Sequence, residues 1–372
     1  MRVELPEAAD RELQAQRFTA QLLAGPPAAS AVEVADRLLA VQGQDPRGAR
    51  LAIRARSSGL TAADVDRACT RERSLLVTWL NRGTLHLVRS EDYWWVHSLT
   101  ARPQFQVGCR RILAGLGLSD SAADKGVRVA EQALLAHGAL TGPQLADRLA
   151  TAGLPSRGGV ALNVLTLASL RGMIVRGPVI GAQHAYVHVR DWLGERPPAP
   201  DPDIALAELA RRYLIGHGPA SEADLAKWAG VPVGQARRGL SAIAGQLRDR
   251  PDDLAELASG PGRQHHGLPS PRLLGAYDPV LLGWASRAAV LGEHQHIVTV
   301  NGLFRPFALV EGRAIGVWAW TRGQVVLDRF AELPAPVESA LAAEARDVQR
   351  FLAAEPGSAD NLQATGDPDA TA

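Results

Sequence analysis

Two glutamines separated by one small residue, Gln42 and Gln44, are the residues of this sequence best suited to chemistry. An amide side chain does not titrate near neutral pH, so neither glutamine can act as a strong general base. Each can, however, donate and accept hydrogen bonds at the same time. This property suits a side chain that holds a water molecule or lines a developing charge. The alternative is that the pair is simply two polar residues at the end of a helix.

The elements that would position the pair are indicated by the residues beside it. Pro46 disfavours the helical conformation at Asp45, and Gly43 loosens the backbone before it. We therefore predict one helix over residues 32–41, and a second helix with Asp45 as its N-cap and Pro46 at its first position. The glutamines would then lie on a helix–loop–helix corner and face one cleft. Asp45 could also add negative potential there, but capping is the favoured role.

Five further side chains are candidates for contacts with a nucleic acid. Arg47, Arg50 and Arg54 recur at spacings of three and four, so they would share one helix face. The ordinary interpretation is a solvated charged face, and the alternative is phosphate contact beside a helix N-terminus. Arg82 lies in a Gly-containing turn of the predicted hairpin, where we predict phosphate contact. His86 follows on the next strand, where it could contact a substrate or could be buried and bonded to the backbone.

Three stretches of the sequence resemble the winged-helix DNA glycosylases related to AlkZ and YcaQ. They are Gln42–Arg47, then Asn81–Val88 with Glu91–Trp95, and finally Ala276–Trp284 with Asn301–Pro306. The resemblance runs from about residue 15 to about residue 330, and it implies that Gln42 and Gln44 are catalytic. A glutamine at the second position is typical of the AlkZ-like branch, whereas the YcaQ-like branch has aspartate there. One departure is Gly43, where the family usually has a larger apolar residue.

The local patterns predict an α+β fold with three tandem winged-helix motifs and a small C-terminal β-sheet or barrel. Apolar residues recur at helical spacing over residues 8–58, and a hairpin is expected over 75–88. The pairs His137-Gly138 and His217-Gly218 occupy matching places, which indicates a repeated unit. The predicted parts are winged-helix units at 1–120, 121–200 and 201–270, a β-rich unit at 271–353 and a disordered tail at 354–372.

Composition sets limits on the function without deciding it. Forty basic and thirty-nine acidic residues give a net charge of +1, so no global charge attracts the chain to nucleic acid. Cys69 and Cys109 are far apart, which argues against a zinc site and against a disulfide framework. No signal peptide or membrane-spanning segment is predicted. We expect a cytoplasmic monomer that needs no metal or other cofactor.

The resemblance implies a DNA glycosylase that acts on double-stranded DNA containing alkylated bases. An N7-alkylated guanine already carries a positive charge, so its departure needs no proton from the enzyme. Two amides could then orient the water and line the oxocarbenium-like sugar. The implied substrates include bulky adducts or interstrand crosslinks from DNA-alkylating natural products, in DNA repair and possible antibiotic self-resistance. A lyase reaction needs an amine, but Lys125 and Lys227 are the only lysines and lie far from the pair in sequence.

Two other classes of function fit parts of the sequence. A non-catalytic winged-helix DNA-binding regulator would keep the same elements, although a recognition helix has no need of the glutamine pair. A scaffold with degenerate winged helices would agree with the net charge of +1. Release of 7-methylguanine from methylated DNA would separate the glycosylase from both alternatives.

Overall fold

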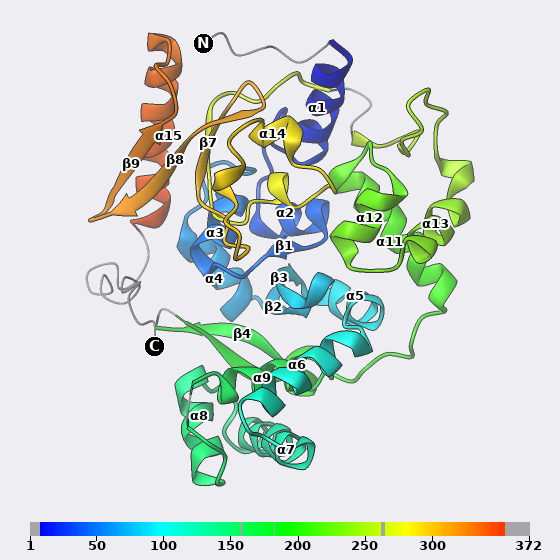
Figure 1. Ribbon diagram of the computed structural model, residues 1–372, viewed down its shortest axis with the longest axis vertical. Coiled ribbons are helices and arrows are strands. Elements are labelled where there is room, and N and C mark those ends of the chain that lie inside the picture. Colours follow the sequence, from blue (N-terminus) through cyan, green and yellow to red (C-terminus); the bar gives the residue numbers. More distant parts are fainter. Residues whose placement is uncertain (1–7, 157, 182, 262–264, 354–372) are drawn as a thin grey trace.

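The computed structural model describes residues 8–353 except 157, 182 and 262–264, so the predicted tail at 354–372 lies outside the described residues. The fold combines helices with two small antiparallel sheets (Figure 1). No helix in the described part of the chain is both long and apolar enough to cross a membrane.

The N-terminal part alternates helices with the strands that carry the two glutamines and the predicted hairpin. Its elements are α1 (Ala8–Ala20), α2 (Ala31–Leu38), β1 (Val41–Gln42), α3 (Pro46–Arg54), α4 (Ala62–Thr70), β2 (Leu75–Leu80), η1 (Asn81–Gly83), β3 (Thr84–Arg89), η2 (Ser90–Asp92), α5 (Tyr93–Thr100) and α6 (Pro103–Gly115).

The second and third parts each begin with three helices. The second comprises α7 (Asp120–His137), α8 (Gly142–Thr151), α9 (Val160–Leu170), β4 (Ile174–Ile180), β5 (Gln183–His188) and α10 (Val189–Leu193). The third comprises α11 (Pro202–His217), α12 (Glu222–Ala229), α13 (Val233–Ala242) and η3 (Ala244–Gln246). The matching helices α8 and α12 both start with a capping box, from Thr141 and Ser221. In each box the hydroxyl and the side chain of the third helical residue accept hydrogen bonds from free backbone N–H groups.

The first two parts share one five-stranded sheet, in the order β1-β3-β2-β4-β5. The hairpin β2–β3 is in register from Leu75–Arg89 to Leu80–Thr84, as the sequence predicts. It joins the wing β4–β5 at the pair Val77 and Arg176. In Figure 1 the helices α7, α8 and α9 lie at the far end of this sheet from the C-terminal strands. The two units are therefore coupled through backbone hydrogen bonds.

The third part lacks a continuous two-stranded wing within the described residues, where only isolated bridges such as Leu247–Leu257 follow its helices. Its core is continuous with that of the first part. Tyr213 and Trp228 pack in one apolar cluster with Tyr93 and Leu76. Burying these large rings stabilises the contact between α11, α12 and the N-terminal helices. A count of three winged helices thus remains a prediction, whereas three helical units are present.

The predicted small C-terminal β-sheet is present, with strand order β6-β7-β8-β9. Its elements are β6 (Arg272–Leu274), η5 (Pro279–Leu281), α14 (Ala288–Leu291), η6 (Gln295–Ile297), β7 (Phe307–Val310), β8 (Arg313–Thr321), β9 (Gln324–Arg329) and α15 (Ala335–Leu352). Strands β7 and β8 are joined by a turn at Glu311-Gly312, and both of these residues have positive φ. Helix α15 lies against this sheet (Figure 1), and its Phe351 is buried in the core of the N-terminal part.

The predicted helix over residues 32–41 is wrong at its C-terminal end. Helix α2 ends at Leu38, Leu39 has a φ of 61°, and Val41 and Gln42 form strand β1. The apolar run before Gln42 fits a strand as well as a helix, and pairing with β3 decides between them, with Gln42 opposite His86. Gln42 therefore ends a strand and Gln44 follows it, instead of both lying on a helix–loop–helix corner.

Candidate active site

Gln42 and Gln44 lie at the end of edge strand β1 and in the loop that leads into α3. Both side chains contact the segment at the start of β3. Gln42 is buried, whereas Gln44 is exposed. The pair thus combines one fixed amide with one amide that faces solvent.

The amide of Gln42 is held by the guanidinium of Arg82. The Nη2 atom of Arg82 donates to Oε1 of Gln42 at 2.8 Å. The Thr84 hydroxyl lies 3.4 Å from the same oxygen, but its single proton has a nearer acceptor in the carbonyl of Asn81, at 3.1 Å. A guanidinium has only donors, so the atom that faces it must be the amide oxygen. The carbonyl of Gln42 is thereby occupied, and its NH₂ group is the part left to meet a substrate.

Arg82 occupies the turn between β2 and β3 with a φ of 59°. Its second nitrogen, Nη1, donates to the backbone carbonyl of Trp228 in the last turn of α12. Burial and the nearby charge of Arg287 lower the pKa of Arg82 to about 10, so it remains a cation at neutral pH. Arg82 forms no ion pair with a carboxylate among the described residues. Two of its N–H groups are thus used inside the protein, and the predicted phosphate contact stays a prediction.

Gln44 and Asp45 mark the start of α3. The amide oxygen of Gln44 accepts only a long hydrogen bond, 3.4 Å from the backbone nitrogen of Leu85. Asp45 is extended, and its carboxylate accepts from the backbone nitrogen of Arg47 at 3.0 Å. The prediction that Asp45 caps this helix, with Pro46 in its first turn, is confirmed. Gln44 is therefore free to accept a hydrogen bond from water or from a substrate.

The segment after β6 closes against α3 by backbone contact. A Cβ atom on Gly48 would collide with the carbonyl oxygen of Ala276, and one on Gly275 would lie 3.1 Å from the Cα of Gly48. Two residues further on, Asp278 forms a bidentate ion pair with Arg56, and both side chains are fully buried. Small residues and this buried pair hold the C-terminal segment beside the glutamine motif.

Aromatic and basic side chains of the C-terminal segment lie near the glutamine motif. The rings of Tyr277 and Phe304 lie 5.0 Å apart, and the guanidinium of Arg287 lies over the Phe304 ring, also at 5.0 Å. Burial, followed by the charge of Asp45, raises the pKa of Tyr277. Tyr277 is thus near the cap of α3, and Arg287 is near Arg82. The structure therefore brings together all three stretches that resemble the glycosylase family.

The three arginines of α3 are not equivalent. Arg47 is exposed and free to reach a phosphate. Arg50 is buried, pairs with Asp66 and donates to the carbonyl of Pro46. Arg54 is buried and pairs with Glu344 and Asp347 of α15. Neither the solvated face nor phosphate contact describes Arg50 and Arg54, because both are used in internal ion pairs.

His86 is buried under the motif and does not line an open surface. Its Nδ1 atom lies 3.0 Å from the carbonyl oxygen of Thr84, so the neutral ring donates to that oxygen. Burial, with the charge of Arg82, lowers the pKa of His86 to about 3. The imidazole is therefore neutral at physiological pH and is bonded to the backbone, in line with the second interpretation of this residue.

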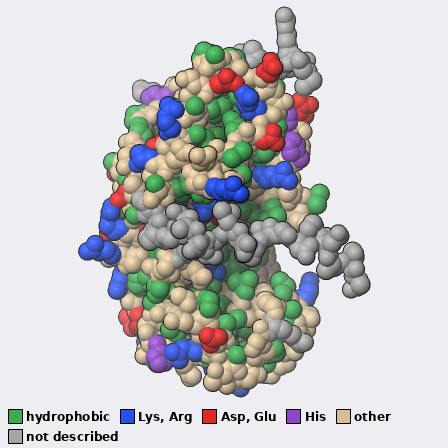
Figure 2. All heavy atoms as spheres, turned by 90° about the vertical axis from the view of Figure 1, so that its left-hand side faces the viewer, with side chains coloured by type: hydrophobic (Ala, Val, Ile, Leu, Met, Phe, Trp, Pro, Cys, Tyr) green, Lys and Arg blue, Asp and Glu red, His purple; other side chains and the backbone are tan. Residues whose placement is uncertain are grey.

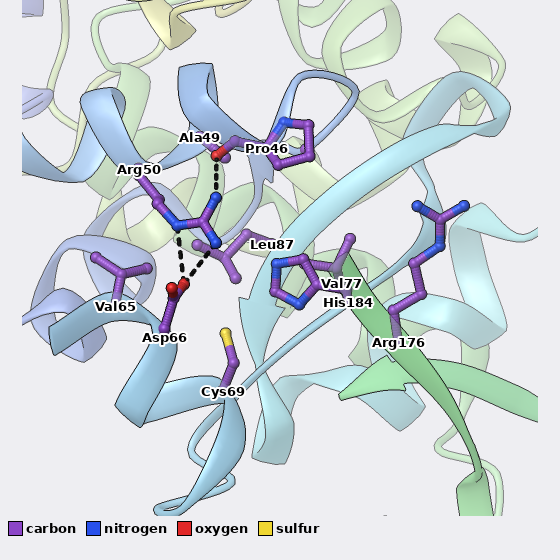
Figure 3. Close-up of a pocket in the computed structure, with 11 residues that line it drawn as sticks. Pro46, Ala49, Arg50, Val65, Asp66, Cys69, Val77, Leu87, Arg176 and His184 are labelled. Carbon is purple, nitrogen blue, oxygen red and sulfur yellow. Dashed lines mark hydrogen bonds and ion pairs between the residues drawn. The ribbon is translucent and has the colours of Figure 1, made fainter. Parts of the chain in front are cut away.

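A small cavity of about 20 Å³ lies behind the motif, beside Gly43 (Figure 3). The side chains of Val77, Leu87 and Cys69 point toward it, and the Arg50–Asp66 pair forms one wall. A Cβ atom on Gly43 would lie 3.4 Å from Val77, at ordinary contact distance. A cavity of this volume holds about one water molecule. It is far too small for a base, and it lies where a larger residue at position 43 would project.

Sequence reasoning missed Thr84, Arg287 and the carbonyl of Trp228 as neighbours of the glutamines. Thr84 belongs to the second stretch of family resemblance, so its presence there was a usable signal. No local pattern marks Arg287 or Trp228, because their proximity to Arg82 depends on packing between segments more than 140 residues apart.

The chain is similar to known proteins over most of its length. The model of the family described as DNA glycosylase AlkZ-like matches residues 35–351. The chain is 26% identical over 377 residues to an interstrand DNA cross-link repair glycosylase of Streptomyces sahachiroi, covering 92% of this chain and 96% of that protein. The solved structure of Streptomyces sahachiroi DNA glycosylase AlkZ is similar, with a TM-score of 0.73 and 25% identity over 93% of this chain and 97% of that one.

Proposed function

The chain belongs to the AlkZ-like DNA glycosylase family, and we propose that it hydrolyses the N-glycosidic bond of N7-alkylated guanine in double-stranded DNA. The observation that carries this proposal is the pair of amides, Gln42 and Gln44, against one short segment of β3. The nearest carboxylate in sequence, Asp45, is used as a helix cap. Such a site suits a leaving group that needs no proton.

The reaction follows from the charge of the substrate. The bond from C1′ to N9 breaks with both electrons going to the base, which cancels the positive charge that N7 alkylation created. A water oxygen bonds to C1′, and the proton that this water loses passes to solvent. Gln44, whose amide oxygen has only one long hydrogen bond, is the acceptor that orients the water. Positioning of this kind lowers the barrier without a strong general base.

Bulky adducts and interstrand crosslinks are the substrates that the site's shape favours. Extruding a base requires a pocket that encloses it, but the cavity beside the motif measures only about 20 Å³ and lies behind Gly43. Gln44 itself is exposed. An adduct approached at the surface need not be extruded. The related Streptomyces sahachiroi protein is an interstrand DNA cross-link repair glycosylase, which supports crosslinks as substrates of this chain.

Contact with the DNA backbone is assigned to Arg47. Its side chain is exposed in the first turn of α3, where the helix N-terminus favours a phosphate. Figure 2 shows basic and acidic side chains interspersed over one face of the molecule, in keeping with the net charge of +1. We therefore expect modest binding to undamaged duplex, with discrimination supplied by the adduct.

The proposal is tested by release of 7-methylguanine from methylated duplex DNA, measured by chromatography of the free base. Gln42→Ala and Gln44→Ala should each reduce the excision rate by on the order of a hundredfold before they weaken DNA binding. Gln44→Asp should keep part of the activity, because the YcaQ-like branch has aspartate there. Gln324→Ala, on exposed strand β9, is the matched control and should behave as wild type.

Full activity in the double variant Gln42→Ala/Gln44→Ala would refute the assignment of the catalytic residues. An inactive wild type that still retards duplex DNA would favour a non-catalytic DNA-binding regulator instead.

A further inference from the structure

Arg82 is held in its turn by contacts from two distant parts of the chain. The turn η1 packs against the C-terminal end of α12, where Gly230 caps the helix with a φ of 71°. A Cβ atom on Gly230 would lie only 2.6 Å from the backbone nitrogen of Arg82. Glycine is required here by close approach as well as by conformation. The end of α12 therefore fixes the backbone from which the Arg82 side chain extends.

The guanidinium of Arg82 donates to two neutral oxygens. One is Oε1 of Gln42 at 2.8 Å, and the other is the backbone carbonyl of Trp228. The last carbonyls of a helix lack partners within the helix and favour a cation, so α12 provides a stable anchor for Arg82. The arginine thus links the third helical unit to the first glutamine of the motif.

We propose that Arg82 is a positioning residue that orients the amide of Gln42, so that Gln42 acts as a hydrogen-bond donor and Gln44 alone acts as the acceptor. This inference rests on the proposed glycosylase function and divides the work of the two glutamines. It replaces the simpler expectation that both amide carbonyls face the sugar and the water.

The orientation follows from the hydrogen-bonding groups involved. If the Gln42 amide rotated by half a turn, its NH₂ group would face the guanidinium, and two donors would meet with no acceptor between them. The charged hydrogen bond would be lost in a buried place, where unpaired polar groups are costly. The amide is therefore held with its oxygen on Arg82 and its nitrogen directed away from it.

A fixed donor has a use in this reaction. As the bond from C1′ to N9 breaks, electron density moves onto the purine, and its ring nitrogens and carbonyl oxygen become better acceptors. An amide N–H that already faces this position stabilises the departing base without reorganisation. The Arg82 cation also polarises the Gln42 carbonyl, which strengthens its N–H groups as donors.

The test compares Arg82→Met and Arg82→Lys on duplex DNA containing 7-methylguanine. Single-turnover excision at saturating enzyme is measured separately from the dissociation constant. Arg82→Met should slow excision by about tenfold to a hundredfold, with an affinity within about threefold of wild type. Arg82→Lys, which restores one charged donor, should recover part of the rate.

The matched control is Arg322→Met. Arg322 also has positive φ, 52°, in a β-turn followed by glycine, but this turn joins β8 and β9. It should leave both rate and affinity unchanged, so it separates the contact with Gln42 from any general effect of losing an arginine in such a turn.

A second pair of variants tests the division of roles without touching Arg82. Gln42→Glu replaces the donor with a carboxylate that can only accept, and it can pair with Arg82, so it should fold. It should lose as much rate as Gln42→Ala. Gln44→Glu keeps an acceptor and should retain more rate than Gln44→Ala. Wild-type rates in Gln42→Glu would overturn the donor role.

The remaining outcomes are also decisive. An Arg82→Met variant with unchanged rate and a reduced slope of log affinity against log salt would make Arg82 a phosphate contact instead. An Arg82→Met variant that matches wild type in both quantities would remove any role. An inactive wild type would refute the proposed function together with this inference, whereas an active wild type with an equally fast Arg82→Met refutes the inference alone.

Discussion

Replacing Gly43 with alanine should stabilise the protein, although this glycine lies between the two glutamines that we propose to be catalytic. Gly43 is buried, and it is absent from the residues with positive φ, so an L-residue can adopt its conformation. A Cβ atom there would lie 3.4 Å from Val77 and 3.5 Å from the backbone nitrogen of Leu87, with no closer neighbour. The methyl group would enter ordinary contact beside a cavity of about 20 Å³.

The expected size of the effect combines two contributions. Alanine restricts the unfolded chain, which is worth about 0.4–1 kcal/mol at a compatible site. Burying one methyl group adds about 0.8 kcal/mol. The free energy of unfolding for Gly43→Ala should therefore rise by roughly 1–2 kcal/mol. The excision rate should be unchanged or higher, because a stiffer backbone holds Gln42 and Gln44 more firmly.

The assay is equilibrium unfolding in urea, followed by circular dichroism, with the midpoint and the slope fitted separately. The matched control is Gly59→Ala, because a Cβ atom on Gly59 meets nothing within 4 Å but its φ is +73°. Left-handed backbone at a residue with a side chain costs about 1–2 kcal/mol, so this variant should be destabilised. A Gly43→Ala variant that unfolds at lower urea than wild type would refute the placement of Gly43 beside a fillable cavity.

Three further predictions concern pH, salt and covalent trapping. Burial lowers the pKa of His86 and of His217 to about 3, whereas an unfolded histidine titrates near pH 6.5. Between these two pH values only the unfolded chain takes up the protons. The free energy of unfolding should therefore be highest above pH 6.5 and should fall by about 1.4 kcal/mol per pH unit below it for each histidine. Equal urea midpoints at pH 7.5 and 5.5 would contradict this. Arg47→Ala should weaken binding to damaged and undamaged duplex alike and reduce the slope of log affinity against log salt by about one; an unchanged slope in fluorescence anisotropy titrations would remove Arg47 from the interface. Borohydride should trap no covalent adduct with DNA, because hydrolysis by water leaves an intact abasic site; an adduct that disappears in Lys227→Ala, one residue from Trp228, would show lyase chemistry.

Local signals predicted the start of α3 and the hairpin. The cap at Asp45, the proline after it and the Gly-containing turn of β2–β3 act over a few residues, so the sequence itself carries the information. The strand β1 could not be predicted in this way. It spans only Val41–Gln42 and exists because β3 pairs with it. The resemblance to a family supplied the grouping of three distant stretches that no periodicity shows.

The arginines of α3 show why spacing alone cannot tell a buried arginine from an exposed one. Their positions at three and four residues apart correctly indicate one helix face, but spacing does not say what covers that face. Asp66 lies 16 residues from Arg50, and Glu344 lies 290 residues from Arg54. Once α4 and α15 supply these carboxylates, both arginines become part of the interior. Of these three arginines, only Arg47, in the first turn of the helix, is exposed.

The position of the motif at the end of strand β1 changes the chemistry expected of it. On a helix, Gln42 and Gln44 would diverge and would need a corner to converge again. In the structure both side chains contact the start of β3, but they meet different partners: Gln42 meets a guanidinium, and Gln44 meets a distant backbone N–H. The sequence alone makes the two amides look interchangeable. Their surroundings differ, and in the mechanism that we propose Gln42 is the donor of fixed orientation toward the departing base, whereas Gln44 accepts from the attacking water.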